Sequence, residues 1–379
     1  MKIAFVNHSF ILGSGIDTVI YELARNLADE HEVTLFTFYN EYDTETLNFE
    51  VKEISIPFKE NRVSRSVLSP IYFHKVAEIR KELANYDVVN THLYPANIIP
   101  LIPTKMKKPY HIITEWSEPG INPNYELTQK LYKRLIKKMN DYAANKADAV
   151  LAPCDFVKKW IKKEYDVDAE LMYLDGVNFD IFDMKKSYKT LESLNNNYPV
   201  ILYVGRIDPY KNIHILIESF EILKKQFKDA KLVIVGKKHF SDYSQRIENL
   251  VKEKNLENDV IFTGVVSWDD LPRYFASSDI YATCTSWEGF LRAEAFAMGK
   301  PMVAFDVGAN SDTIKNGQNG ILVYKQIPEV FAEALIKLAA DDDLRKKMGE
   351  NGYEWAKKNL DFKAIAKNFI NFAESRLSK

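Results

Sequence analysis

Short apolar runs alternate with longer amphipathic segments along all 379 residues of the chain. Continuous apolar runs of this length are typical of buried parallel strands, and apolar residues that recur every three to four positions indicate helices. In the first half the predicted strands are Ile3–Val6, Val33–Phe38, Phe49–Ile56, Asp87–His92, His111–Trp116 and Ala149–Ala152. Strands alternating with helices are typical of a doubly wound, Rossmann-like parallel sheet.

The second half repeats this alternation. Its predicted strands are Val200–Val204, Leu232–Val235, Val260–Thr263, Ile280–Thr283, Met302–Phe305 and Ile321–Val323. Between the halves, Lys185–Tyr198 is polar, rich in Ser and Asn, and without periodicity, so it is the candidate linker. Two helices, at Asp343–Asn359 and Phe362–Leu377, follow the last strand, and one of them can return to the first half.

We therefore predict an α/β protein with two Rossmann-like, doubly wound domains that face each other across a cleft. The expected first domain covers residues 1–180 and the second 181–360, and the helix at 361–379 is expected to pack toward the first domain. A hinge is expected near Gly176–Tyr198, and closure of the cleft would bring the first domain toward the second.

Composition narrows the class of protein. An apolar fraction of 46%, a charged fraction of 27% and a net charge of −2 are ordinary for a soluble globular protein and give no electrostatic reason to expect nucleic acid. Cys154 and Cys284 lie far apart beside apolar runs and are expected to be buried free thiols. The sequence shows no signal-peptide pattern and no run long enough to span a membrane, which predicts a cytoplasmic protein.

A basic helix is predicted over roughly 125–146. Two interpretations are open: its apolar stripe faces the core beneath a solvated basic face, which we favour, or the helix lies on an anionic membrane surface. The second would make the protein peripheral at the inner membrane face. The stripe consists of Leu127, Leu131, Leu135, Met139 and Tyr142.

Candidate chemistry begins where predicted strands end. Val200–Val204 runs into Gly205 and a loop that carries Arg206 and Lys211 before the next helix. Two cations at the carboxyl end of a strand, beside a helix N-terminus, favour an anion such as phosphate. Ordinary solvated loop charges are the alternative, with about equal weight on this stretch alone. Gly13-Ser-Gly15 similarly follows the first strand and precedes a helix, as in a Rossmann-like unit.

A second informative stretch runs from Ser286 to Pro301. Glu288 falls in a loop after a strand, and Glu294 falls in the first turn of a short helix. A carboxylate at such a position can accept hydroxyl groups of a ribose. Both glutamates could equally be charges that favour the start of a helix.

Taken together, these motifs resemble the family 4 glycosyltransferases, which have the GT-B fold. The resemblance spans nearly the whole chain and is more specific than any one motif. It is carried by the Gly-Arg loop with a Lys, by Phe-x-Gly and Asn-Gly motifs, and by two glutamate-containing segments. The residues are Gly205, Arg206, Lys211, Gly236, Phe262-Thr-Gly264, Glu288-Gly-Phe290, Glu294-Ala-Phe-Ala-Met-Gly-Lys-Pro301, Gly308-Ala-Asn310, Asn319-Gly320 and Asp175-Gly-Val-Asn-Phe-Asp-Ile-Phe182.

The resemblance implies a hexosyltransferase that moves a sugar from a nucleotide-diphosphate donor to a sugar, lipid or glycan acceptor, with retention of configuration and without a metal or other cofactor. Arg206 and Lys211 would hold the diphosphate, and Glu294 the ribose. Glu288 would lie near the transferred sugar. The implied donor-side backbone positions are Gly13, Gly15, Gly205, Gly236, Phe290 and Leu291.

The chain departs from the family in two places. Five residues separate Glu288 from Glu294, two fewer than the family usually has, which affects the role of Glu288. Thr114 is followed by Glu115, where the family often has a His, so Glu115 or His92 becomes the candidate for contact with the sugar.

Two other functions are consistent with parts of the pattern. A non-catalytic GT-B protein that binds a nucleotide or a partner would also account for the missing His. A dehydrogenase would be expected to have a third glycine in the first loop and an acid after the second strand, but Thr18 and Tyr39 occupy these positions.

Overall fold

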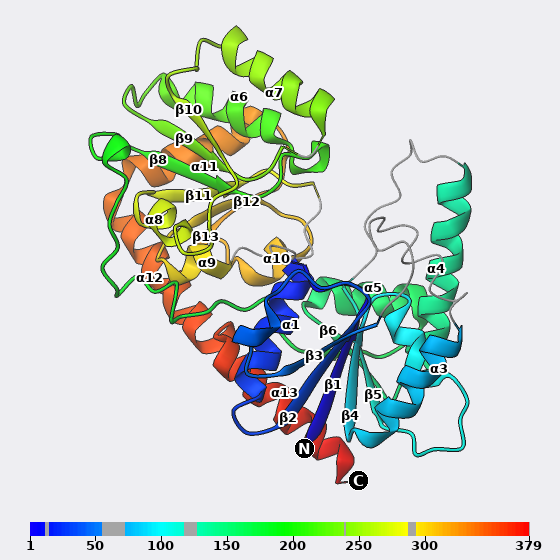
Figure 1. Ribbon diagram of the computed structural model, residues 1–379. Helices are drawn as coiled ribbons and strands as arrows, with labels where there is room; N and C mark the ends of the chain where they lie inside the picture. The colour runs from blue at the N-terminus through cyan, green and yellow to red at the C-terminus, as the bar shows by residue number, and fades with distance from the viewer. Residues whose placement is uncertain (12–14, 55–72, 117–126, 239, 287–292, 379) are drawn as a thin grey trace. The chain divides into compact units, whose positions relative to one another are not determined.

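The computed structural model describes residues 1–11, 15–54, 73–116, 127–238, 240–286 and 293–378, with the side chains of 73–75 and 127–132 outside that description. The chain divides into two compact units, each described here by itself (Figure 1). Unit 1 contains Met1–Leu174 together with Phe362–Lys379, and unit 2 contains Asp175–Asp361.

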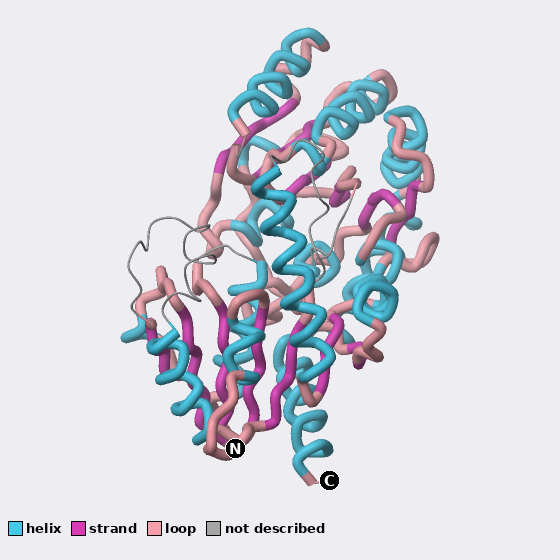
Figure 2. Tube along the Cα trace, turned by 90° about the vertical axis from the view of Figure 1, so that its right-hand side faces the viewer, coloured by secondary structure: helices cyan, strands magenta, loops and turns pink. Residues whose placement is uncertain are grey.

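Unit 1 is built on a parallel sheet of seven strands in the order β3-β2-β1-β4-β5-β6-β7. Figure 2 shows these strands running side by side. Every pair in the sheet is parallel, and β1 lies between β2 and β4, with Asn7 opposite both Thr37 and His92. The strands are β1 (Lys2–Asn7), β2 (Glu32–Thr37), β3 (Glu50–Glu53), β4 (Val88–His92), β5 (Tyr110–Thr114), β6 (Ala149–Ala152) and β7 (Glu170–Leu171).

Alternate residues of β1 face opposite sides of the sheet. Ala4 and Val6 join a buried cluster with Val76 and Ile79 of one helix. Phe5 stacks on Phe369 of another helix, with ring centroids 5.9 Å apart. Both faces are therefore covered, as a parallel sheet requires. The helices of unit 1 are α1 (Gly15–Leu27), α3 (Phe73–Glu82), α4 (Leu127–Lys146), α5 (Asp155–Tyr165) and α13 (Phe362–Leu377), with 3₁₀ turns η1 (Thr44–Thr46), η3 (Leu83–Asn85) and η4 (Ala96–Leu101).

The last helix belongs to unit 1 although the chain reaches it from unit 2. In Figure 1, α13 lies beside α1, and the two helices are in contact. Arg376 near its C-terminus pairs with Glu170 of β7 at 2.5 Å. The C-terminal helix therefore completes one face of the first sheet.

Unit 2 is built on a six-stranded parallel sheet in the order β10-β9-β8-β11-β12-β13. Its strands are β8 (Val200–Val204), β9 (Lys231–Val235), β10 (Val260–Gly264), β11 (Ile280–Thr283), β12 (Met302–Phe305) and β13 (Gly320–Val323). Its helices are α6 (Ile213–Lys224), α7 (Ser241–Glu253), α8 (Leu271–Ala276), α9 (Ala293–Ala297), α10 (Ala309–Thr313), α11 (Pro328–Ala340) and α12 (Asp342–Asn359), with 3₁₀ turns η5 (Glu192–Leu194) and η6 (Pro209–Lys211).

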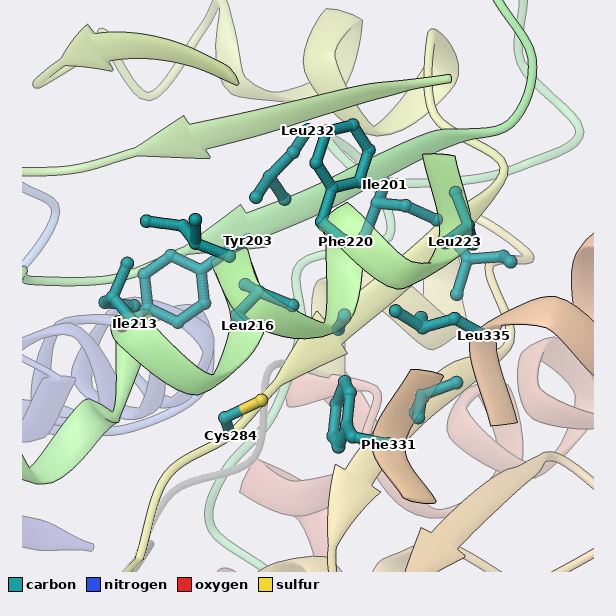
Figure 3. Packing of buried hydrophobic residues seen from close by; sticks show 14 of the residues in the cluster. Ile201, Tyr203, Ile213, Leu216, Phe220, Leu223, Leu232, Cys284, Phe331 and Leu335 are labelled. Carbon is teal, nitrogen blue, oxygen red and sulfur yellow. The ribbon is translucent and has the colours of Figure 1, made fainter. Parts of the chain in front are cut away.

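The core of unit 2 fills the space between the sheet and two packed helices. Leu216 and Phe220 of α6 lie in one buried cluster with Phe331 and Leu335 of α11, and all four are fully buried (Figure 3). Cys284 joins the same cluster, and Cys154 is likewise buried; neither of these two cysteines forms a disulfide in the described part of the chain. The Cys284 thiol therefore packs as a small apolar side chain.

The fold class predicted from the sequence is confirmed, and most element bounds agree within one or two residues. The short strand β7 was not predicted, because two exposed residues carry no apolar signal. The segment 185–198, predicted as a linker, lies within unit 2: Leu194 is buried, and the Leu191 amide donates to Ser277 Oγ at 2.8 Å. Its polar composition is that of a surface segment of unit 2. The chain passes between the units at 174–175 and 361–362 instead.

The favoured interpretation of the basic helix was wrong for two residues of its stripe. Leu135 and Tyr142 of α4 are 54% and 51% exposed. Among the described side chains of α4, the buried ones are Ala143 and Ala144. The side chains of Leu127 and Leu131 lie outside the described residues.

We expect Phe369→Ala to destabilise unit 1. Phe369 is fully buried, and removing a buried aromatic ring typically costs about 3–5 kcal/mol of unfolding free energy. Urea unfolding followed by far-UV circular dichroism measures the change, with the exposed neighbour Asn371→Ala as the control. Equal midpoints for the two variants would show that α13 contributes little to unit 1.

Candidate functional site

The strand order of unit 2 locates its binding edge. Strand β8 comes first in the chain of its sheet and lies between β9 and β11, so the connections leave β8 and β11 in opposite directions. In open α/β sheets this switch point leaves a crevice at the carboxyl ends of the two strands, where ligands bind. The segment 205–212 follows β8, and the segment 284–286 follows β11.

The first of these segments lies against the end of β9. Gly205 N donates to Val235 O at 2.9 Å, and Ile207 N donates to Lys237 O at 2.9 Å. Gly236 has φ +142°, and a Cβ there would lie 2.0 Å from the Gly205 carbonyl oxygen. A glycine at position 236 is thus needed for the two backbones to meet, and this close approach fixes the path of the chain beside Arg206.

Arg206 is half exposed and anchored at the same time. Its Nη2 donates to the Tyr210 hydroxyl at 2.6 Å and lies 3.1 Å from Asp208 Oδ2. Its carbonyl oxygen accepts from the Tyr203 hydroxyl at 2.9 Å. Lys211, at the end of η6, places Nζ 5.2 Å from the centroid of the Tyr210 ring. The sequence-predicted pair of cations therefore shares one short loop, with Tyr210 between them.

The loop after β8 is bonded to the segment after β11. The Tyr210 carbonyl oxygen accepts from Ser286 N at 2.9 Å and from Ser286 Oγ at 3.1 Å. Asn212 has φ 51°, and its side-chain amide donates to Cys284 O at 3.0 Å. The segment that leads to Glu288 is thus held beside the loop that carries the two cations.

Of the other candidates in unit 2, Glu294 lies among the described residues. Glu294 is 7% exposed in the first turn of α9, four residues before Met298, whose N–H donates to the Glu294 carbonyl at 2.9 Å. Glu288, Phe290 and Leu291 lie outside the described residues.

The first loop of unit 1 is held by a buried polar pair. Asn7 ends β1, and its Nδ2 donates to Asp17 Oδ1 at 2.7 Å and to Ser9 O at 2.8 Å. Asp17 Oδ2 accepts from Ile11 N at 3.0 Å. These bonds fasten the chain just before the glycine pair. Gly15 begins α1, whereas Gly13 lies outside the described residues.

Candidates for the missing histidine lie at the ends of β4 and β5. His92 is fully buried between Phe5 and Trp116, and its Nδ1 accepts from Trp116 Nε1 at 3.1 Å. Burial lowers the pKa of His92 to about 3, so its ring is neutral. Glu115 is 5% exposed, and its Oε1 accepts from Trp116 N at 3.2 Å. The His92 ring therefore has no exposed surface in this structure.

Sequence reasoning missed the residues that support the candidates. Asp208 and Tyr210 contact Arg206, and Asn7 and Asp17 fasten the first loop. A signal for Asp208 was its place two residues after Arg206 on the same loop. Nothing in the sequence revealed that Asp17, in the first turn of an amphipathic helix, points back to the end of β1.

Comparison with known proteins agrees with this geometry. Residues 185–355 match the family model described as glycosyl transferases group 1, and residues 13–174 match glycosyltransferase family 4. An uncharacterized glycosyltransferase of Methanocaldococcus jannaschii is 25% identical over 95% of this chain and 94% of its own. The two matched models together cover both units.

Solved structures share the same two-domain architecture. Sucrose-phosphate synthase of Thermosynechococcus elongatus superposes with a TM-score of 0.80 at 19% identity, covering 100% of this chain and 99% of its own. Anabaena HepE, solved with UDP and glucose, gives 0.78 at 20% identity, covering 99% of this chain and 100% of its own. The two sheets and these neighbours define the GT-B fold. The chain belongs to the family 4 glycosyltransferases, as its motifs predicted.

Acidification should weaken unit 1 through two buried histidines. Burial lowers the pKa of both His92 and His111 to about 3, below the ordinary value of 6.5 that they regain on unfolding. The unfolded chain therefore takes up protons that the folded chain does not, and stability falls as the pH drops from 6.5 toward 3. Each histidine contributes about 1.4 kcal/mol per pH unit in that window.

Urea unfolding at pH 7.5, 6.5, 5.5 and 4.5 tests this expectation. His111→Gln, which cannot protonate in this range, should remove about half of the histidine contribution to the slope. A slope that does not change in this variant would show that His111 is not the group that titrates.

Proposed function

We propose that this glycosyltransferase takes its sugar from a nucleoside-diphosphate donor that binds at the carboxyl ends of β8 and β11. The observation that carries the proposal is the loop 205–212. It presents Arg206 and Lys211 at the switch point of the sheet and is bonded through Tyr210 to the segment after β11. A structural neighbour was solved with UDP and glucose, which is consistent with a donor of this type.

The two cations suit the charge that develops during transfer. The bond between the anomeric carbon and the diphosphate oxygen breaks, and its electron pair leaves with the diphosphate. The acceptor hydroxyl oxygen bonds to the anomeric carbon and releases its proton. Fixed guanidinium and ammonium groups beside the leaving diphosphate stabilise the transition state more than the ground state. In this proposal Arg206 and Lys211 supply that charge without a metal ion.

Supporting roles follow from the positions of other groups. The Glu294 carboxylate would accept hydrogen bonds from the ribose hydroxyl groups. Gly13 and Gly15 remain proposed positions for a close approach of the backbone to the diphosphate, as the family resemblance implies. We further propose retention of configuration, as the family resemblance implies, which nuclear magnetic resonance of the product anomer tests.

For the position that often holds a histidine in the family, Glu115 is the better of the two candidates. Its carboxylate stands in the segment that follows β5, whereas His92 is neutral and covered by Trp116. Glu115→Gln keeps the size of the side chain, so a loss of turnover with unchanged melting temperature would support the assignment.

Helix α4 supports a further proposal, peripheral contact with an anionic membrane surface. Leu135 and Tyr142 are seven residues apart and therefore on one face of α4, and both are exposed. Arg134, Lys138 and Lys146 are exposed on the same helix. Apolar side chains flanked by cations are typical of helices that lie in the membrane interface. None of the described helices is long and apolar enough to cross a membrane.

Loss of Lys211 should slow catalysis. For Lys211→Ala we expect kcat with a sugar nucleotide to fall about 10²–10³-fold, corresponding to about 2.7–4 kcal/mol, because one donor to a developing anion is removed. Lys225→Ala, on the far end of α6, is the matched control. The kcat of each protein is measured as the steady-state release of nucleoside diphosphate over a panel of donors. A kcat of Lys211→Ala equal to that of the wild type would reject the role of Lys211 at the diphosphate. If the wild-type protein binds a donor without turnover, the non-catalytic alternative is favoured.

Loss of the exposed apolar residues of α4 should weaken membrane contact. We expect Leu135→Ser with Tyr142→Ser to lower partitioning onto phosphatidylglycerol vesicles by about tenfold or more, because each buried apolar side chain contributes about 1.5–3 kcal/mol. Tyr324→Ser, which removes an exposed aromatic ring from unit 2, is the control. Vesicle co-sedimentation measures the change, and equal partitioning of all three proteins would reject α4 as the contact.

A further inference from the structure

A buried carboxylate stands beneath the proposed diphosphate site. Asp208 is two residues after Arg206, and its side chain is 1% exposed. It occupies the position before η6, yet its side chain makes no capping hydrogen bond there. Burying an ionised carboxylate is costly unless an opposite charge or hydrogen bonds compensate it. The local turn therefore gives no reason for an acid at this position.

Arg206 is the cation that compensates Asp208. Asp208 Oδ2 forms an ion pair with Arg206 Nη2 at 3.1 Å, and neither carboxylate oxygen accepts a hydrogen bond from the described residues. The same Nη2 donates to Tyr210 Oη at 2.6 Å. One nitrogen of the guanidinium is thus held from two sides, while half of the side chain remains open to solvent.

The holding groups are themselves fixed in the fold. The Asp208 carbonyl oxygen accepts from Lys211 N at 3.0 Å, which closes the turn that carries the second cation. The Tyr210 carbonyl oxygen accepts from Ser286 N at 2.9 Å. The position of the guanidinium is therefore set by contacts that continue into the segment after β11.

We propose that Asp208 is a positioning residue that orients Arg206 for the diphosphate of the donor, a role that rests on the proposed function. The carboxylate restricts the guanidinium to one orientation before the donor arrives. Less rearrangement is then needed as charge builds on the leaving group, and preorganisation of this kind acts mainly on kcat. Tyr210 assists through its hydroxyl group.

Graded substitutions of Asp208 test the proposal. Asp208→Leu has a similar size and removes both charge and acceptor, whereas Asp208→Asn keeps a neutral acceptor. We expect kcat to fall about 100-fold in Asp208→Leu and about tenfold in Asp208→Asn, with the KM for the donor changed less than kcat. Asp279→Asn is the matched control, because Asp279 accepts from Val200 N at 2.8 Å at the opposite end of β8. It should lower the melting temperature without lowering kcat.

A double-mutant cycle shows whether Asp208 acts through Arg206. If it does, adding Asp208→Leu to Arg206→Ala should change kcat no further, since there is no guanidinium left to position. Multiplying losses would overturn the proposal. The cycle also separates two failures: wild-type kcat in Arg206→Ala rejects the proposed function at this residue, whereas a slow Arg206→Ala with a fast Asp208→Leu rejects only the role of Asp208.

Stability gives a readout that does not depend on activity. Arg206→Ala leaves Asp208 buried without its cation, so its melting temperature should fall by several degrees, and adding Asp208→Leu should recover most of that loss. Should Asp208→Leu alone fail to fold, this recovery and the kcat of Tyr210→Phe, expected about tenfold lower, decide the question. No recovery in the double variant and full kcat in Tyr210→Phe would overturn the proposal.

Discussion

The close approach of three backbone segments at the end of β8 is the constraint on which the proposed donor site of this protein depends. Gly205 bonds to Val235, Gly236 bonds to Gly264, and a side chain at Gly236 would collide with the Gly205 carbonyl oxygen. Because β8, β9 and β10 are adjacent in the sheet, their exits are held at one edge. The loop that begins at Arg206 therefore has little freedom in where it starts, and its side chains are presented from a fixed backbone.

In unit 1, by contrast, polar side chains are buried within two neighbouring strands of the sheet, β4 and β5. Asn90 donates to Thr114 Oγ1 at 3.0 Å, and Thr91 Oγ1 lies 3.0 Å from His111 Nε2. Such groups are tolerated in a core when they bond to one another. They restrict how β4 and β5 can pair and so hold the segment of Glu115 at a defined place, at the cost of making the unit sensitive to acid.

Much of the fold could be predicted from the sequence because buried parallel strands leave a local signal. The run Val200–Val204 and the helix Phe362–Leu377 were found with the bounds that the structure has. The prediction that the apolar stripe of α4 faces the core failed for a physical reason. Periodicity shows that a helix has an apolar face, but it does not show that the rest of the protein covers that face. Leu135 and Tyr142 are exposed, whereas the buried ones among the described side chains of α4 are Ala143 and Ala144.

The candidate site was predictable only in part, for a related reason. Arg206, Lys211 and Glu294 belong to motifs with a regular spacing, whereas the groups that hold them depend on tertiary contacts. Nothing local shows that Tyr210 reaches Ser286, or that Asp17 reaches Asn7. Which residues support the charged groups depends on how neighbouring strands bring distant segments together. Local sequence patterns therefore identify the charged residues but not the residues that contact and orient them.

The two cations of the loop are held by unlike means, and this difference bears on how they can act. Arg206 is held by a buried carboxylate and a hydroxyl, which both contact the same guanidinium nitrogen. Lys211 lies by the ring of Tyr210, a contact that attracts an ammonium group without setting a single geometry. A planar guanidinium matches a specific pair of oxygens, whereas an ammonium group acts as a compact point charge. The loop thus carries two cations of different chemistry within six residues, Arg206 to Lys211.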